Sequence, residues 1–178
     1  MVGPDDTNRE SADSISSGAE NCDWAAVMPI GTASRRLSLS VSALRKYETE
    51  GLIVYQRTPA ARRLLAPADL DRIRRIQSLI GDCGLNMEGI RRLVALIPCW
   101  ELMPCTPEDR RACSAAVETT RPCWMTEQTE CARRGMNCRQ CRVYRKALEW
   151  LPNLKALLHD PAIRAAAAAD QFNPESDC

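Results

Sequence analysis

Cysteine thiols are the side chains whose type and spacing in this sequence most clearly point to chemistry. Seven of the ten cysteines lie within residues 99–141, at Cys99, Cys105, Cys113, Cys123, Cys131, Cys138 and Cys141. A free cysteine often packs as a small hydrophobic residue, and two or three of the seven could do only that. So high a concentration nevertheless predicts a thiolate site that binds a metal ion or an iron–sulfur cluster.

The pair Cys138 and Cys141 is the strongest candidate chelate. Only two residues separate the thiols, and closing so short a loop costs little entropy. Nearby arginines are expected to lower the pKa of these thiols or to offset the negative charge of a cluster. These arginines are Arg133, Arg134, Arg139 and Arg142. As further ligands we rank Cys99, Cys105, Cys123 and Cys131 next, and Cys113 last.

The identity of the metal stays open between two all-thiolate sites. The one histidine of the chain, His159, lies outside the cysteine segment, which excludes a mixed Cys/His zinc site there. The irregular spacing favours an iron–sulfur cluster over the alternative, Zn²⁺ bound by four thiolates. Cys83 is expected in the core, whereas Cys22 and Cys178 are expected to have no role.

A basic segment precedes the cysteines. The net charge of the whole chain is only +1, but residues 29–97 hold twelve Arg and Lys against six Asp and Glu, a surplus of +6. A phosphate-binding surface needs such a surplus, because each Lys or Arg that contacts DNA releases condensed counterions. We therefore expect double-stranded DNA as the partner of this segment.

The apolar pattern of the basic segment predicts mainly helices. Residues 33–50 are expected to form a helix, a tight turn and a second helix that Ser40 caps. The β-prone run 52–55 and a returning strand within 57–66 would form a hairpin, or wing. Two amphipathic helices are expected to follow. Pro67 opens the first, whose apolar stripe lies within residues 69–80 and which Gly81 and Gly84 stop, and Asn86 caps the second, which Pro98 ends.

Short motifs run through this segment in a fixed order. They are Ile30-Gly31, the stretch from Ser40 to Leu52, Arg57, Arg63, Pro67, Asp69-Leu70 and the stretch from Gly84 to Ile90. Together they resemble the N-terminal pattern of the MerR family of bacterial transcriptional regulators. The resemblance implies a winged helix-turn-helix over residues 28–97, which binds a palindromic operator as a homodimer and acts with RNA polymerase at the promoter.

The resemblance also assigns roles within the second helix and the wing. Leu44 would anchor the recognition helix to the core. The expected DNA-contacting residues are Ser42, Arg45, Lys46, Tyr47, Arg57 and Arg63. Ser42, Arg45 and Tyr47 are expected to project from the recognition helix, and Arg63 is expected to contact the DNA backbone from the wing.

Three positions depart from the family pattern. Ser38 stands where glycine usually precedes the recognition helix, and Leu65 stands where the wing commonly has an aromatic residue. Pro98-Cys99 interrupts the chain where a long dimerising coiled coil usually follows the fourth helix. We therefore expect a short dimer interface, and residues 142–158 are the candidate.

The cysteine segment contains two Cys-Trp pairs, Cys99-Trp100 and Cys123-Trp124. The pattern over residues 99–144 resembles a two-CW module found in bacterial sensory proteins. That resemblance implies a sensory role without identifying the ligand. The two tryptophans are expected to form an apolar wall that shields the site from water.

We therefore predict a mainly α protein, in which a winged helix-turn-helix precedes a small Cys-rich domain, stabilised by a metal or cluster, and a C-terminal helix. The expected divisions are a disordered leader (1–27), a DNA-binding domain (28–97), a sensor module (98–144) and a C-terminal helix with a tail (145–178). The N-terminus is acidic, and no apolar run is long enough for a membrane helix, so a cytoplasmic protein without membrane contact is expected.

The expected function is a transcriptional regulator, not an enzyme, that senses redox state, iron–sulfur cluster status or metal. Two alternatives stay open. One is a zinc-stapled DNA-binding regulator without sensing, in which the cysteines replace a thin core. The other is a dithiol oxidoreductase that uses Cys138 and Cys141, against which no βαβ pattern surrounds the pair.

Overall fold

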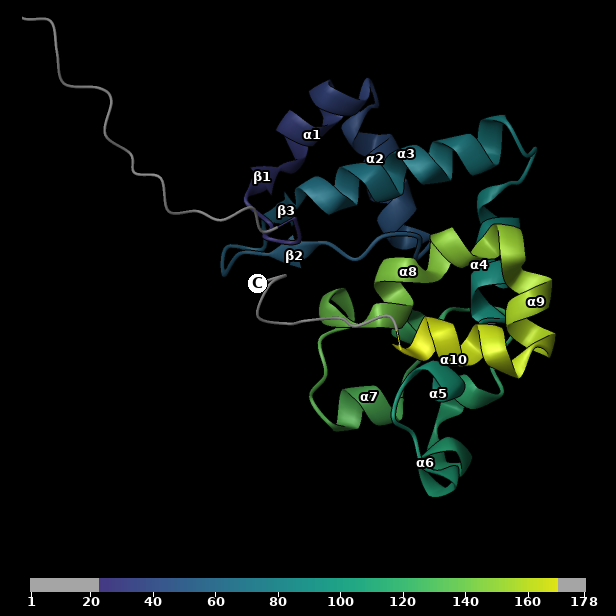
Figure 1. Cartoon of the computed structure of the whole chain (residues 1–178). Helices are drawn as coiled ribbons and strands as arrows, with labels where there is room; N and C mark the ends of the chain where they lie inside the picture. The colour runs from purple at the N-terminus through teal and green to yellow at the C-terminus, as the bar shows by residue number, and fades with distance from the viewer. Residues whose placement is uncertain (1–22, 170–178) are drawn as a thin grey trace, which may run out of the picture.

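The computed structural model describes residues 23–169, and most of them are helical, as predicted. The strands are β1 (Met28–Pro29), β2 (Gln56–Arg57) and β3 (Arg63–Leu65). The α-helices are α1 (Ile30–Leu37), α2 (Val41–Thr49), α3 (Pro67–Gly81), α4 (Met87–Ala95), α5 (Cys99–Leu102), α6 (Pro107–Ala112), α7 (Glu130–Arg133), α8 (Arg142–Trp150), α9 (Leu154–His159) and α10 (Pro161–Ala169). The 3₁₀ turns are η1 (Ser114–Ala116), η2 (Cys123–Met125), η3 (Cys138–Gln140) and η4 (Leu151–Asn153). Figure 1 shows α1, α2 and α3 at one end of the molecule, α6 and α7 at the other, and α8 between them.

The early helices begin where side-chain chemistry predicts. The Ser40 hydroxyl caps α2 by accepting a hydrogen bond from the backbone N–H of Ala43 at 3.0 Å. Asn86 caps α4 in the same way, because its side-chain oxygen accepts from the N–H of Gly89 at 2.7 Å. Gly84 adopts a left-handed conformation in the turn between α3 and α4. The helix starts predicted at Ser40 and Asn86 are therefore confirmed.

The wing is a small antiparallel sheet in the strand order β1-β3-β2. The strand expected over residues 52–55 is wrong, since this mostly buried segment has no strand partner and pairing begins at β2. Its backbone carbonyls accept hydrogen bonds from the side chains of Arg72 and Arg139 instead. Buried backbone groups need a partner, but that partner need not be another strand. β1, which the sequence pattern did not predict, pairs with β3 through Met28 and Leu65.

One hydrophobic core runs through both halves of the chain. It joins Leu44, Ile73 and Ile90 of the first half to Val143 and Leu148 of α8. Burial of apolar surface is the main stabilising term in folding, so the two halves stabilise each other. The boundary predicted near residue 97 separates two kinds of sequence that pack on a common core.

Both ends of the described segment are more structured than expected. Trp24, which the sequence places in the leader, packs edge-on against Tyr144 with ring centroids 6.1 Å apart. The alanine-rich run near the C-terminus, within the segment expected to form a helix with a tail, belongs to α10, which packs against α5. There Arg164 of α10 forms an ion pair with Glu101 of α5. A tertiary contact therefore stabilises each segment where local sequence predicts little order.

The candidate dimer interface over residues 142–158 stays a prediction, and α8 offers it little apolar surface. The apolar side chains of α8 are buried within their own chain, namely Val143, Tyr144, Ala147 and Leu148. Leu158 at the other end of the candidate segment is exposed. Dimerisation itself also stays a prediction.

Two parts of the predicted organisation lie outside the described residues. They are the leader up to residue 22, which includes Cys22, and the tail from residue 170, which includes Cys178. Every helix within residues 23–169 falls short of the length and apolar content that crossing a membrane requires.

Candidate functional site

Helices α1 and α2 form a helix-turn-helix with a tight connection. Ser38 in the turn has a φ of 52°, in the left-handed region that glycine adopts at lower cost. The hydroxyl of Ser34 donates a hydrogen bond to the carbonyl oxygen of Leu39 at 2.5 Å and closes the turn. The position where we expected glycine therefore has a glycine-like backbone although serine occupies it.

The outer face of α2 is polar and exposed. Ser42, Arg45 and Lys46 have exposed side chains, whereas Leu44 is fully buried. The role of Leu44 as the anchor of this helix is confirmed. Exposed hydroxyl and basic side chains on such a helix can reach phosphates and base edges. The contacts of these three residues with DNA stay a prediction.

Tyr47 differs from the expectation that it projects outward with Ser42 and Arg45. Its side chain packs in the hydrophobic core, and only 8% of the residue is exposed. Burial also raises the pKa of the Tyr47 phenol. The helical period places position 47 three residues after Leu44, on the buried face. Any contact between Tyr47 and DNA stays a prediction.

The wing arginines are bound to the recognition helix. Arg57 and Arg63 lie opposite each other on β2 and β3. Both form ion pairs of 2.6 Å with the carboxylate of Glu48 on α2. These contacts hold the wing against α2 and compete with phosphate for the same guanidinium groups. Arg57 and Arg63 must therefore release the carboxylate of Glu48 before they can make the predicted phosphate contacts.

Sequence reasoning missed Arg62, which is exposed in the turn at the tip of the wing. Its backbone N–H donates to the Thr58 hydroxyl at 3.2 Å, and the preceding Ala61 has a left-handed φ of 57°. A basic residue in the turn of a predicted hairpin was the available signal. Arg35 and Arg36 of α1 are exposed basic residues as well.

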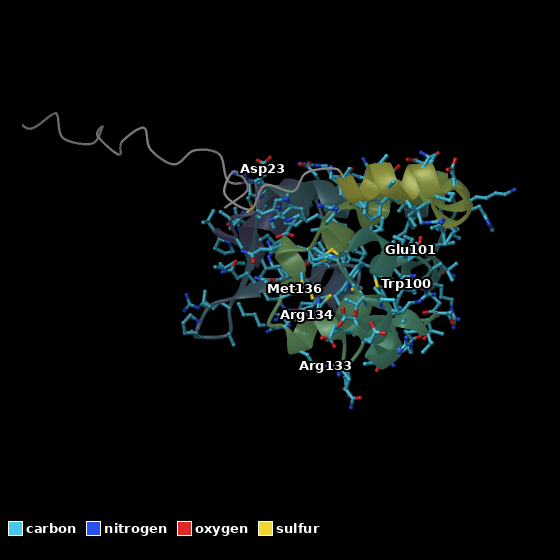
Figure 2. The ribbon with its side chains drawn as sticks, turned by 60° about the horizontal axis from the view of Figure 1, so that its bottom comes forward. Asp23, Trp100, Glu101, Arg133, Arg134 and Met136 are labelled. Atoms are coloured by element: carbon cyan, nitrogen blue, oxygen red, sulfur yellow. The ribbon has the colours of Figure 1, made fainter. Side chains whose placement is uncertain are left out.

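All seven cysteines of residues 99–141 line a single cavity of about 40 Å³. One water molecule needs roughly 10–15 Å³ on this measure, so the space suffices for a small bound group. Figure 2 shows sulfur atoms in the interior between the labelled Met136 and Trp100. Thiols separated by many residues in the sequence therefore meet in one place.

Several thiols of the cavity accept or share hydrogen bonds. The side chains of Cys99 and Cys123 are hydrogen-bonded to each other. The sulfur of Cys113 accepts from the backbone N–H of Glu130 at 3.5 Å, and the thiol of Cys141 donates to the sulfur of Met103 at 3.9 Å. N–H groups aimed at sulfur support thiolate ligands of metals and clusters. As they stand, no three metal-ligating side chains within residues 23–169 are close enough to hold one ion.

The arginines near Cys138 and Cys141 do not lower the thiol pKa values as expected. Burial raises the pKa of both thiols. Arg139 turns away from them and forms a buried ion pair of 2.9 Å with Asp69. The other three arginines bond to carboxylates or backbone carbonyls, namely Arg133, Arg134 and Arg142. The expected lowering of the thiol pKa values is wrong, because burial outweighs the charge of Arg142, which does act to lower the pKa of Cys141. That the arginines offset the charge of a cluster stays a prediction.

Cys83 lies apart from the cavity. It is exposed in the turn between α3 and α4, beside Gly84. The expectation that Cys83 belongs to the core is therefore wrong. Helix α3 ends at Gly81, so Cys83 does not continue the buried stripe of that helix.

The two tryptophans of the Cys-Trp pairs line the cavity, as expected of an apolar wall, but their polar contacts differ. Nε1 of Trp124 donates to the carbonyl oxygen of Gly51 at 2.8 Å. Nε1 of Trp100 is buried and has no hydrogen-bond partner within residues 23–169. A buried donor without an acceptor costs about 1–3 kcal/mol. Trp100 therefore points to an acceptor that the described residues do not supply.

Comparison with known proteins identifies the first half of the chain. Residues 28–96 match the family described as MerR HTH family regulatory protein. The chain is 36% identical over 72 residues to the HTH-type transcriptional regulator GlnR of Bacillus anthracis and of Bacillus cereus, covering 40% of this chain and 55% of that protein. It is 33% identical over 70 residues to HspR of Streptomyces coelicolor, named as a heat shock protein, covering 39% of this chain and 46% of that protein.

The match confirms the MerR-type helix-turn-helix domain that the sequence motifs predict. The chain spans about half the length of the curated relatives it matches. The matched family segment ends before Cys99, so the cysteine cavity has no counterpart in that match.

Proposed function

We propose that this protein is a DNA-binding transcriptional regulator of the MerR type whose cysteine cavity holds a thiolate-bound metal or iron–sulfur cluster. Redox state, cluster status or metal would then be the signal. The observation that carries the proposal is the exposed basic face of α2, at Arg45 and Lys46, on a domain that shares its core with the cysteine region. The names of GlnR and its relatives as regulators support it.

The mode of DNA binding belongs to the same proposal. The protein would bind a palindromic operator as a homodimer, next to RNA polymerase in the cytoplasm. Wing and recognition helix would contact phosphates on both sides of a major groove. Activation would work through deformation of the promoter DNA rather than through additional base contacts.

The cavity residues fit an all-thiolate group. No histidine lines the cavity, the backbone N–H of Glu130 points at the sulfur of Cys113, and the buried indole N–H of Trp100 lacks an acceptor that a bound sulfur would provide. Cys138, Cys141, Cys99 and Cys123 are the ligands we favour. When bound, an iron–sulfur cluster supplies a group that gains or loses an electron and that oxidants destroy.

The spacing of the thiols favours a cluster over a single zinc ion. Four sulfurs on one tetrahedral Zn²⁺ lie about 3.8 Å apart, given Zn–S bonds of about 2.3 Å. In an iron–sulfur cluster the thiolates bind different irons, so they lie further from one another. Seven thiols share the cavity, yet no three within the described residues cluster tightly enough for one ion.

DNA binding is tested by fluorescence anisotropy with duplexes that the protein selects from a randomised pool. Arg45→Ala should weaken binding about 5- to 100-fold, as loss of a base or phosphate contact does. The affinity of the wild type should fall steeply with salt. Arg111→Ala, which removes the same charge from the exposed surface of α6, is the matched control and should bind as the wild type does. Equal loss in both variants would reject α2 as the DNA-reading element.

The bound group is tested on protein purified without oxygen. Iron, acid-labile sulfide and zinc are measured together with the absorption spectrum. A brown protein with iron and sulfide supports the cluster. Tightly held zinc alone, with DNA affinity indifferent to oxidant, would instead support the zinc-stapled regulator without sensing.

A further inference from the structure

Residues 51–55 connect the end of the recognition helix α2 to strand β2 of the wing. We call them the linker. Leu52, Ile53 and Tyr55 are buried, and the linker has no strand partner. Because it joins the two elements that would contact DNA, its position sets the angle between them.

The first contact on the linker comes from η2. Nε1 of Trp124 donates to the carbonyl oxygen of Gly51 at 2.8 Å. Gly51 has a φ of +69°, and a side chain there would collide with Met125, the next residue of η2. Glycine is therefore required at this point both by the backbone conformation and by the approach of η2.

The second set of contacts comes from η3 and α8. The backbone N–H of Val54 donates to the phenol oxygen of Tyr144 at 2.8 Å. The carbonyl of Val54 accepts from Nη1 of Arg139 at 2.5 Å. Arg139 at the same time binds both carboxylate oxygens of Asp69, at 3.0 and 2.9 Å. Residue 54 is therefore bound at both of its backbone polar atoms by side chains of the C-terminal half.

A buried arginine links these contacts to one another. Nε of Arg72 donates to the carbonyl of Leu52 at 2.8 Å, and its Nη1 donates to the carbonyl of Tyr144 at 2.6 Å. The guanidinium also lies 4.2 Å from the centroid of the Tyr144 ring. Hydrogen-bonded networks of this kind hold their members in one arrangement because a buried polar group is costly to leave unpaired.

Three of the four residues that hold the linker lie within three positions of a cavity cysteine, and Arg72 of α3 is the exception. Trp124 follows Cys123, and Arg139 follows Cys138. Tyr144 lies three residues after Cys141 and itself lines the cavity. A shift of these sulfurs by binding or losing a group would therefore move the side chains that hold the linker.

We infer that the cysteine cavity controls DNA affinity through the linker, with Trp124, Arg139 and Tyr144 as positioning residues. This inference rests on the proposed function. It adds the route by which the cavity acts, within one chain and without a coiled coil. Coupling of two sites through an element that both of them position is expected to be reciprocal, so DNA should also favour one state of the cavity.

The experiment compares DNA affinity with the cavity loaded and emptied. Full-length protein is reconstituted anaerobically with ferrous iron and sulfide, or stripped with a chelator, and titrated with a duplex selected from a randomised pool. The ratio of the two Kd values measures the coupling, which is about 5- to 150-fold for typical linked sites. Trp124→Phe removes only the N–H that binds Gly51, and Tyr144→Phe removes only the oxygen that accepts from Val54.

Both variants should bind iron and sulfide with the stoichiometry of the wild type. In each variant, however, the ratio of the Kd values for DNA with the cavity loaded and emptied should fall several-fold toward one. Trp150→Phe is the matched control, because it is the same kind of change at the end of α8, and Trp150 is not among the residues that line the cavity. It should keep the ratio of the wild type.

The outcomes separate this inference from the proposed function. The inference is overturned if both Trp124→Phe and Tyr144→Phe keep the Kd ratio of the wild type. It is also overturned if the Kd of the wild type is the same with the cavity loaded and with the cavity emptied. A wild type that binds no duplex in either state overturns the proposed function itself.

Discussion

The DNA-binding region (residues 28–97) and the cysteine region (residues 98–141) are stabilised in different ways. Helices of the first region bury large apolar side chains such as Leu44. The second region consists of short helices and 3₁₀ turns, and beyond α5 its buried residues include the small Ala115 and the charged Arg139. The cysteine region therefore buries too little apolar surface of its own to be stable by that term alone. Hydrogen bonds, one buried ion pair and, in our proposal, the thiolate site must hold it in place.

The two regions meet at the ion pair between Arg139 and Asp69. Its two side chains are 7% and 0% exposed, which makes it the most buried of the ion pairs described within residues 23–169. Asp69 also accepts from the backbone N–H of Ala66 at the start of α3, at 2.8 Å. One carboxylate thus serves a helix start in the first region and a tertiary contact with the second.

Arg139→Ala should have the largest effect, because it breaks the junction between the regions. Removing one partner of a buried pair leaves an uncompensated charge and costs about 3–5 kcal/mol of unfolding free energy. Urea unfolding followed by circular dichroism measures the loss. Arg134→Ala, which removes the more exposed ion pair with Asp109, should cost far less. Equal losses in the two variants would refute the central role of the junction.

Removing the bound metal or cluster should increase the difference in local stability between the two regions. With its thiolate site emptied, the cysteine region should open to trypsin at Arg110, Arg111, Arg133 and Arg134. The rate of cleavage there should rise more than about tenfold, which corresponds to only about 1.4 kcal/mol. Sites within α3 and α4 should stay protected by the apolar core. Mass spectrometry of the fragments identifies the cleaved sites. Equal increases of the cleavage rate in both regions would contradict this prediction.

Ser38→Gly should affect the DNA-binding region alone. Glycine adopts the left-handed φ of this turn without the steric cost that serine bears, so unfolding free energy should rise by up to about 1 kcal/mol. Arg75→Gly, at an exposed position inside α3, serves as the control and should lower it by about 1 kcal/mol. Thermal unfolding of both variants provides the measurement, and destabilisation by Ser38→Gly would contradict the strain at this turn.

Glu48→Gln should have the smallest effect on stability and still change DNA binding. Its partly exposed ion pairs with Arg57 and Arg63 contribute below about 1 kcal/mol each. Once released, both guanidinium groups can bind phosphate, so DNA affinity and its salt dependence should increase. Glu88→Gln, which releases two arginines of α4, should leave DNA affinity unchanged. Unchanged affinity in Glu48→Gln as well would remove the wing arginines from the interface.

The helix starts and the buried face of the recognition helix could be predicted from the sequence alone. Ser40 and Asn86 cap their helices, and Leu44 anchors α2, because capping and helical periodicity depend on residues only three or four positions apart. The ordered motifs of residues 28–97 identified the MerR-type domain through their resemblance to that family. Cysteine count and the absence of a nearby histidine led to the prediction of an all-thiolate site, which stays a prediction.

The contacts that join the N-terminal and C-terminal halves of the chain became known only from the folded structure. Arg139 was expected to serve the cysteines beside it, but it binds Asp69, which is 70 positions away. The segment 52–55 has the composition of a strand, yet both backbone polar atoms of Val54 bond to side chains that folding brings from the C-terminal half. Such contacts leave no periodic pattern, because they depend on where distant segments pack rather than on the order of neighbouring residues.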